Sequence, residues 1–125
     1  MTDAQPSNPH RDDVIAGMTP LLASIIEGPS NMCLTLKLEG DADRWVQYMA
    51  DSVNAAYFDD EPPTDDLLYA LGPSIVTSFE AREHLTVTLA ARDPESIAAW
   101  MYDYFRLVLE CEDAFVLDVE VEDLA

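Results

Sequence analysis

The chain has 125 residues with 25 Asp or Glu and 6 Lys or Arg, so its formal net charge is −19 at pH 7. This charge argues against direct binding to nucleic acid or to an anionic membrane, because both need Lys or Arg at the protein surface. Hydrophobic residues make up 49% of the chain, which is typical of a folded protein and excludes an acidic disordered one.

The first eleven residues are polar and include Pro6 and Pro9, so we expect a flexible arm and no signal peptide. Residues 12–125 are expected to form a single α+β domain. No apolar run approaches the length that a membrane span needs. The two cysteines, Cys33 and Cys111, lie far apart and predict neither a disulfide framework nor a metal motif. We therefore expect a cytoplasmic protein.

A helical apolar stripe covers residues 12–27 and ends at Gly28-Pro29. Pro20 interrupts the stripe, so either the helix is kinked there or a second helix begins with Thr19 as its cap. Residues 33–39 then alternate between apolar and polar and predict a half-buried strand. Asp41 is interpreted as the cap of a helix that extends to Phe58, with its apolar stripe formed by Ala42, Trp45, Val46, Met49, Val53, Ala56 and Tyr57.

The second half of the chain carries clearer boundary signals. Thr64 and the acids after it predict a short helix up to Leu71. Residues 75–80 and 85–89 predict a hairpin. Asp93-Pro94-Glu95 opens a helix with a cap, a proline in the first turn and an acid. Residues 115–122 alternate strictly and predict a last strand.

Two segments share the pattern of an alternating strand, an aspartate and an amphipathic stretch with a tryptophan. This repeat predicts a ferredoxin-like split β-α-β-β-α-β sandwich: one antiparallel sheet, two helices on one face and an extra N-terminal helix. The open face would carry threonines and acids where an RNA-binding sheet has aromatic residues, so RNA binding is not expected. The apolar stripe of the N-terminal helix makes a homodimer plausible.

Acidic residues follow both predicted core helices and line the last strand. Acids at helix C-termini do not stabilise the helices, because the dipole is already negative there. We therefore predict that they bind a basic partner protein; the residues are Asp59, Asp60, Glu61, Glu110, Glu112, Asp113, Asp118, Glu120 and Glu122.

Enzymatic chemistry has little support in the sequence. His10 and His84 fall on the predicted arm and a predicted loop, and the sequence contains no phosphate loop and no nucleophile elbow. The acidic run Asp59–Glu61 before two prolines matches no calcium loop. We expect no enzyme, no metal and no cofactor.

Three explanations of the acidity remain. The first is electrostatic recognition of a basic protein. The second is mimicry of nucleic acid, in which acids at steps of about 6.6 Å along the last strand imitate phosphates and inhibit a DNA- or RNA-binding protein. The third is solubility or salt adaptation without any partner.

Overall fold

The chain folds into an α+β structure with a six-stranded antiparallel sheet and three helices. The computed structural model describes residues 9–28, 32–49, 52–72, 74–90, 92–111 and 115–123. In chain order, the elements are α1 (Pro9–Glu27), β1 (Met32–Leu38), β2 (Asp41–Met49), β3 (Ser52–Ala56), α2 (Asp65–Leu71), β4 (Ser74–Glu80), β5 (His84–Leu89), α3 (Pro94–Leu107) and β6 (Leu117–Asp123). The strand order is β4-β5-β3-β2-β1-β6.

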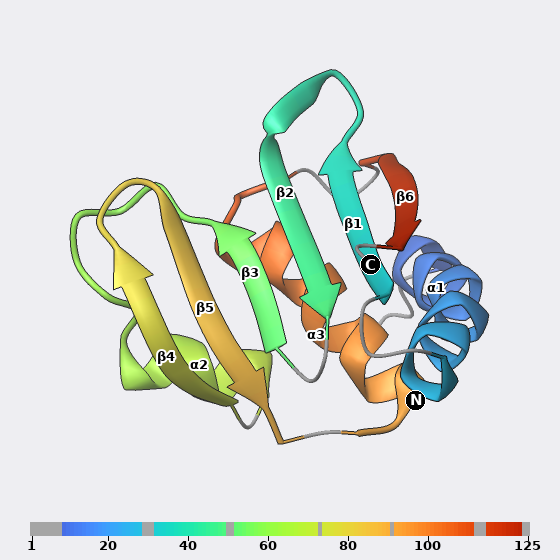
Figure 1. The fold of residues 1–125 in the computed structure, drawn as a ribbon. Coiled ribbons are helices and arrows are strands. Elements are labelled where there is room, and N and C mark those ends of the chain that lie inside the picture. The colour runs from blue at the N-terminus through green and yellow to red at the C-terminus, as the bar shows by residue number, and fades with distance from the viewer. Residues whose placement is uncertain are drawn as a thin grey trace, which may run out of the picture.

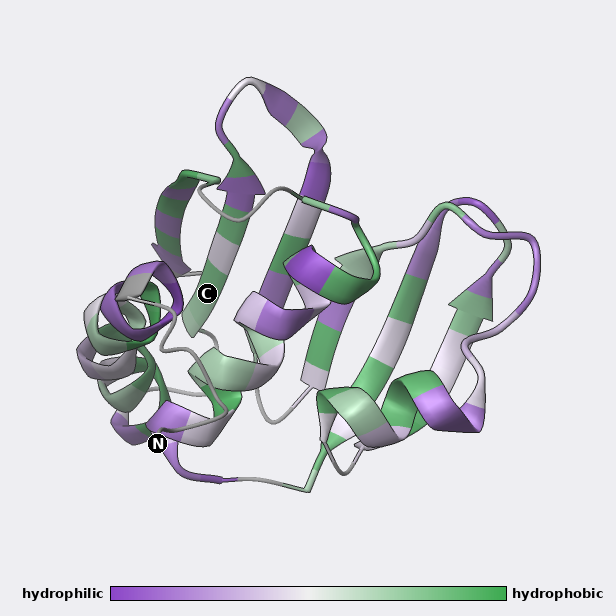
Figure 2. Cartoon of the chain, turned by 180° about the vertical axis from the view of Figure 1, so that it is seen from behind, coloured by the Kyte–Doolittle hydropathy of each residue, from purple (hydrophilic) through white to green (hydrophobic). Residues whose placement is uncertain are grey.

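The three helices lie on one face of the sheet, and the other face is open (Figures 1 and 2). Helix α3 runs behind the centre of the sheet, with α1 beside it towards β6 and α2 behind β4 and β5 (Figure 1). Among the described residues, no helix is both long enough and apolar enough to cross a bilayer.

The core lies between the sheet and α3. On β1, Leu34 and Leu36 are fully buried, because alternate residues of a strand point to the same face. Helix α3 turns its buried stripe towards them, from Ile97 to Phe105. The Tyr104 hydroxyl donates a hydrogen bond of 2.8 Å to the carbonyl of Ala56 at the end of β3. This bond ties the central helix to the middle of the sheet.

The structure confirms most of the elements with clear boundary signals. Thr64 caps α2, with its hydroxyl accepting from the backbone of Leu67 at 3.2 Å. Asp93 caps α3 in the same way, accepting from Ser96 at 2.9 Å. The β4–β5 hairpin and strand β1 are also present. Pro20 lies inside one continuous α1, so no second helix begins there.

The helix predicted for residues 42–58 is wrong. Most of the described residues in this range form strands β2 and β3, which pair as a hairpin, and Asp41 begins a strand instead of capping a helix. Val46 and Tyr48 are buried on one face of β2. They pair with Ala55 and Val53 of β3, which are buried as well. The hairpin joins β1 to β5, each of which would otherwise be paired on one side only.

The topology of the chain therefore differs from the predicted split arrangement. The expected split order contains a helix where the chain has a hairpin, so the internal repeat is not a structural one. Trp45 pairs with Lys37 on the open face, where it is half-buried. His84 belongs to β5 and not to a loop. Of the expected arm, residues 9–11 are helical and residues 1–8 lie outside the described residues.

Candidate partner-binding surfaces

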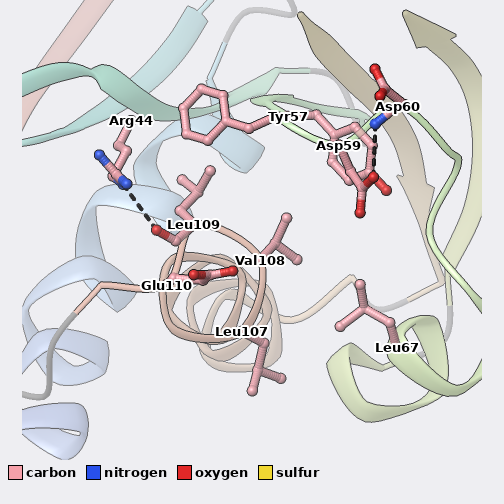
Figure 3. Close-up of a pocket in the computed structure, with 10 residues that line it drawn as sticks. Arg44, Tyr57, Asp59, Asp60, Leu67, Leu107, Val108, Leu109 and Glu110 are labelled. Carbon is pink, nitrogen blue, oxygen red and sulfur yellow. Dashed lines mark hydrogen bonds between the residues drawn. The ribbon is translucent and has the colours of Figure 1, made fainter. Parts of the chain in front are cut away.

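Four parts of the fold surround a groove of about 400 Å³, which we call the acidic groove (Figure 3). Residues from β2, from the segment after β3, from α2 and from the end of α3 line it: Arg44, Tyr57, Phe58, Asp59, Asp60, Leu67, Leu107, Val108, Leu109 and Glu110. The groove thus brings Asp59 and Asp60 close to Glu110, although about fifty positions of sequence separate them. Asp59 and Asp60 were expected to follow a helix, whereas in the structure they follow strand β3.

The segment after β3 is held in place by its own polar groups. The Asp59 carboxylate accepts from the backbone N–H of Asp60 at 2.7 Å, and this bond fixes a local turn. The Tyr57 hydroxyl donates to the Glu61 carbonyl at 2.5 Å. Asp60 forms an exposed ion pair of 2.5 Å with Arg82 from the β4–β5 turn. Asp59 and Asp60 therefore have a structural use in addition to any binding.

Arg44 of β2 closes the other side of the groove. Its Nε donates to the carbonyl of Leu109 at 2.9 Å (Figure 3), a favourable contact of a cation with the negative end of α3. It also pairs with the Asp41 carboxylate and lies over the Phe58 ring, 5.4 Å from its centroid. The next residue after Leu109, Glu110, is exposed and adopts a left-handed backbone with φ of 57°.

The groove combines apolar surface with carboxylates. Phe58 is 45% exposed and Leu107 is 49% exposed. Glu110, one of the three acids that line the groove, forms no ion pair within the described part of the chain. Such a surface suits a lysine or arginine side chain, whose methylene stem packs on apolar groups while its charged end reaches a carboxylate.

A second set of acids, which we call the strand acids, lies on β6: Asp118, Glu120 and Glu122. They pair in register with Lys37, Thr35 and Cys33 of β1, and so lie on the open face. Lys37 forms an ion pair of 3.4 Å with Glu120. No residue of β6 lines the acidic groove. The structure therefore divides the predicted site into two separate surfaces.

A polar row crosses the open face through the middle of all six strands. In spatial order from β6 to β4, it consists of Glu120, Thr35, Gln47, Asn54, Thr86 and Ser78. Gln47 donates to the Thr35 hydroxyl at 3.1 Å, and Thr86 donates to the Asn54 side-chain carbonyl at 2.5 Å. These groups satisfy one another, so the centre of the open face offers a ligand few free polar atoms.

Four of the six basic residues, Arg11, Lys37, Arg44 and Arg82, form ion pairs with acids of the same chain. Little positive charge is left to offset the remaining carboxylates. The acidic surfaces therefore retain a negative potential that attracts cations.

The cysteines give no sign of reactivity. Cys33 and Cys111 are both buried, and burial raises the pKa of each thiol above its ordinary value. Within the described ranges, no group of three or more His, Cys, Asp or Glu residues is arranged to hold a metal ion.

Glu112 and Asp113 lie outside the described residues. Seven of the ten groove residues were not predicted, among them Arg44, Phe58 and Leu107. Phe58 stands next to an aspartate in the sequence, which was the available signal for it. Leu107 has no acidic neighbour in the sequence, and the role of Arg44 depends on the missed strand β2. No protein-family model, curated protein or solved structure matches this chain.

Proposed function

We propose that the protein is a non-enzymatic interaction protein that binds a basic partner protein through its acidic groove. The observation that carries the proposal is the placement of Glu110 beside the exposed Phe58 and Leu107 in one groove, since Glu110 forms no ion pair in the part of the chain that the structure describes. A purely solvated acidic surface has no need of exposed large apolar side chains.

The net charge would act mainly on the rate of association. Long-range attraction steers a basic partner to the surface, and salt screens it. The short-range contacts, with apolar surface and individual carboxylates, would then hold the partner in one orientation.

The test compares two triple variants of equal net charge in capture of proteins from a lysate of the source organism. The groove variant carries Asp59→Asn, Asp60→Asn and Glu110→Gln, the three acids that line the groove. The control carries Asp13→Asn, Glu27→Gln and Glu80→Gln, exposed acids that do not line the groove. We expect the groove variant to lose a basic partner by about tenfold or more in affinity, and the control to lose little. Equal loss in both variants would show that only the net charge attracts the partner.

Mimicry of nucleic acid is the second candidate, favoured by the regular row of strand acids on one face of β6. It predicts that DNA or RNA competes with the chain for its partner. A partner that binds nucleic acid and the chain simultaneously would exclude mimicry but leave the first proposal intact.

A further inference from the structure

Strand β6 lies at one edge of the sheet, and no described strand pairs with its outer side. It pairs with β1 over seven residues and ends the strand order of the described sheet. No register shift interrupts this ladder, whereas β4 at the opposite edge carries an irregularity between Val76 and Ser78. A flat, regular edge is a template for another strand, and irregularities are one of the devices that prevent such pairing.

The backbone groups that face outwards can be assigned. The carbonyl of Val116 accepts from the N–H of Glu39 at 2.8 Å, so the backbone of Val116 points towards β1. Because the direction alternates along an antiparallel strand, the backbone groups of Leu117, Val119 and Val121 point away from β1. These N–H and C=O groups are the ones that an added strand would pair with.

The two faces of β6 differ in chemistry, as the alternating bands of hydropathy show (Figure 2). The strand acids lie on the open face. Val119 and Val121 lie on the helix face, opposite Leu36 and Leu34, yet each is 46% exposed. The helices therefore cover the apolar side chains of β1 but leave the valines of β6 partly exposed to solvent.

Beside these valines runs a groove of about 340 Å³ between α1 and β6, which we call the edge groove. Its lining is mostly apolar and includes Val14 and Leu21 of α1 and Val119 of β6. Gly17 also lines it, and a Cβ placed on this glycine would meet no atom within 4 Å. The helix therefore leaves room along the edge for apolar side chains of an added strand.

Charge decides whether a second copy of β6 or a basic strand of another protein fits beside this edge. If β6 paired with β6 of a second copy, the strand acids of both copies would face one another on the open face, and like charges directly opposite destabilise a sheet. Lys37 forms an ion pair with Glu120 from β1, behind the edge. A strand with basic residues opposite the acids and apolar residues opposite the valines would satisfy both faces.

We propose that β6 binds an extended segment of another protein by strand addition, and that this segment alternates basic and apolar residues. The proposal rests on the proposed function for the basic character of the partner, and adds a second surface and a backbone conformation. The backbone pairing supplies affinity, and the alternation supplies specificity.

The test uses full-length protein and the labelled peptide Lys-Val-Lys-Val-Lys-Val-Lys, with binding followed by fluorescence anisotropy. A block isomer, with the four lysines before the three valines, has the same charge and composition. We expect the alternating peptide to bind about tenfold or more tightly than the block isomer. Equal affinity of the two peptides would overturn strand addition.

Two N-methylated forms of the alternating peptide test the backbone pairing itself. One carries methyl groups on the three valine nitrogens, the other on three lysine nitrogens. In antiparallel addition the valine N–H groups face β6, so only valine methylation abolishes binding; in parallel addition only lysine methylation does. Loss with one set alone supports the proposal and gives the strand direction, and equal effects of the two sets overturn it.

Protein variants locate the binding site. Asp118→Asn with Glu120→Gln and Glu122→Gln, and separately Val119→Thr with Val121→Thr, are each expected to weaken the alternating peptide about tenfold. The control triple used above removes the same charge elsewhere and should have little effect. If the peptide responds to the groove variant and not to these, strand addition is wrong but the proposed function stands. If the groove variant captures partners normally while these variants lose the peptide, only the proposed function fails.

Discussion

Tyr104 shows how one side chain couples the central helix to the sheet. Its ring is fully buried and stacks on Trp100 at 5.4 Å, and its hydroxyl donates to the Ala56 carbonyl. Burial raises the pKa of Tyr104, because the phenolate would be left without solvent. Tyr104→Phe leaves that carbonyl without its donor, and we expect a loss of about 1–3 kcal/mol in the free energy of unfolding, measured in urea.

Tyr69 provides the control for this substitution. It is 90% exposed, and Tyr69→Phe should change the free energy of unfolding by less than about 0.5 kcal/mol. Equal effects of the two substitutions would mean that the Tyr104 hydrogen bond contributes nothing to stability.

Asp93 links the stability of α3 to pH. Its carboxylate accepts hydrogen bonds from the hydroxyl and the backbone of Ser96, and these bonds lower its pKa below the ordinary value of 3.8. The charged form is thus favoured by folding, so its contribution is fully present above that ordinary value and is lost as the pH falls through the lower, folded pKa.

The variant Asp93→Asn keeps a capping oxygen but cannot titrate. We expect wild type to lose more stability than this variant as the pH falls from neutral to below about 3.8. Urea unfolding of both proteins at several pH values measures the difference. Parallel pH profiles would show that the carboxylate of Asp93 does not contribute through its charge.

At the scale of elements, the sequence predicts those whose ends carry side-chain caps or whose faces alternate cleanly. Helices α2 and α3 were predicted because Thr64 and Asp93 are typical N-cap residues and stand directly before the first turns. Strands β1 and β5 were found because apolar and polar residues alternate along them, and the alternating apolar residues, such as Leu36 and Val87, are buried. Such signals depend on neighbours in sequence and not on the rest of the fold.

Strands β2 and β3 lacked that clarity for a physical reason. The open face of β2 carries Trp45 and Met49, which are half-buried. Apolar residues therefore lie on both faces of β2, and its sequence does not alternate between apolar and polar residues. The same residues match a helical stripe by chance. Helix propensity is a weak preference that tertiary pairing overrides, and here the pairing is to β1 and β5, which no local pattern reveals.

The candidate site was predictable only where neighbours in the sequence reveal it. The sequence singled out acids that do not stabilise a helix, among them Asp59 and Glu110, and both line one groove. Their apolar neighbours Phe58 and Leu107 come together only through the fold. The strand acids were assigned to the correct face, because alternation within β6 is local information.

For the whole molecule, the charge of −19 has two distinct physical consequences. Carboxylates repel one another across the surface and oppose folding, and the same field attracts cationic partners. Salt screens both effects, with a Debye length of about 10 Å at 0.1 M and about 3 Å at 1 M. The way in which stability responds to salt therefore separates ordinary repulsion from adaptation to high salt.

We expect the free energy of unfolding to rise with NaCl and to level off by about 0.5 M, since most surface charges are screened once the Debye length is shorter than their separation. Urea unfolding at fixed pH over a series of NaCl concentrations measures this. Choline chloride at equal ionic strength is the control, because screening does not depend on which cation is used. A steady rise into the molar range would contradict simple repulsion and favour salt adaptation as the reason for the acidity. A plateau would leave the acids of the groove and of β6 to be explained by what they bind.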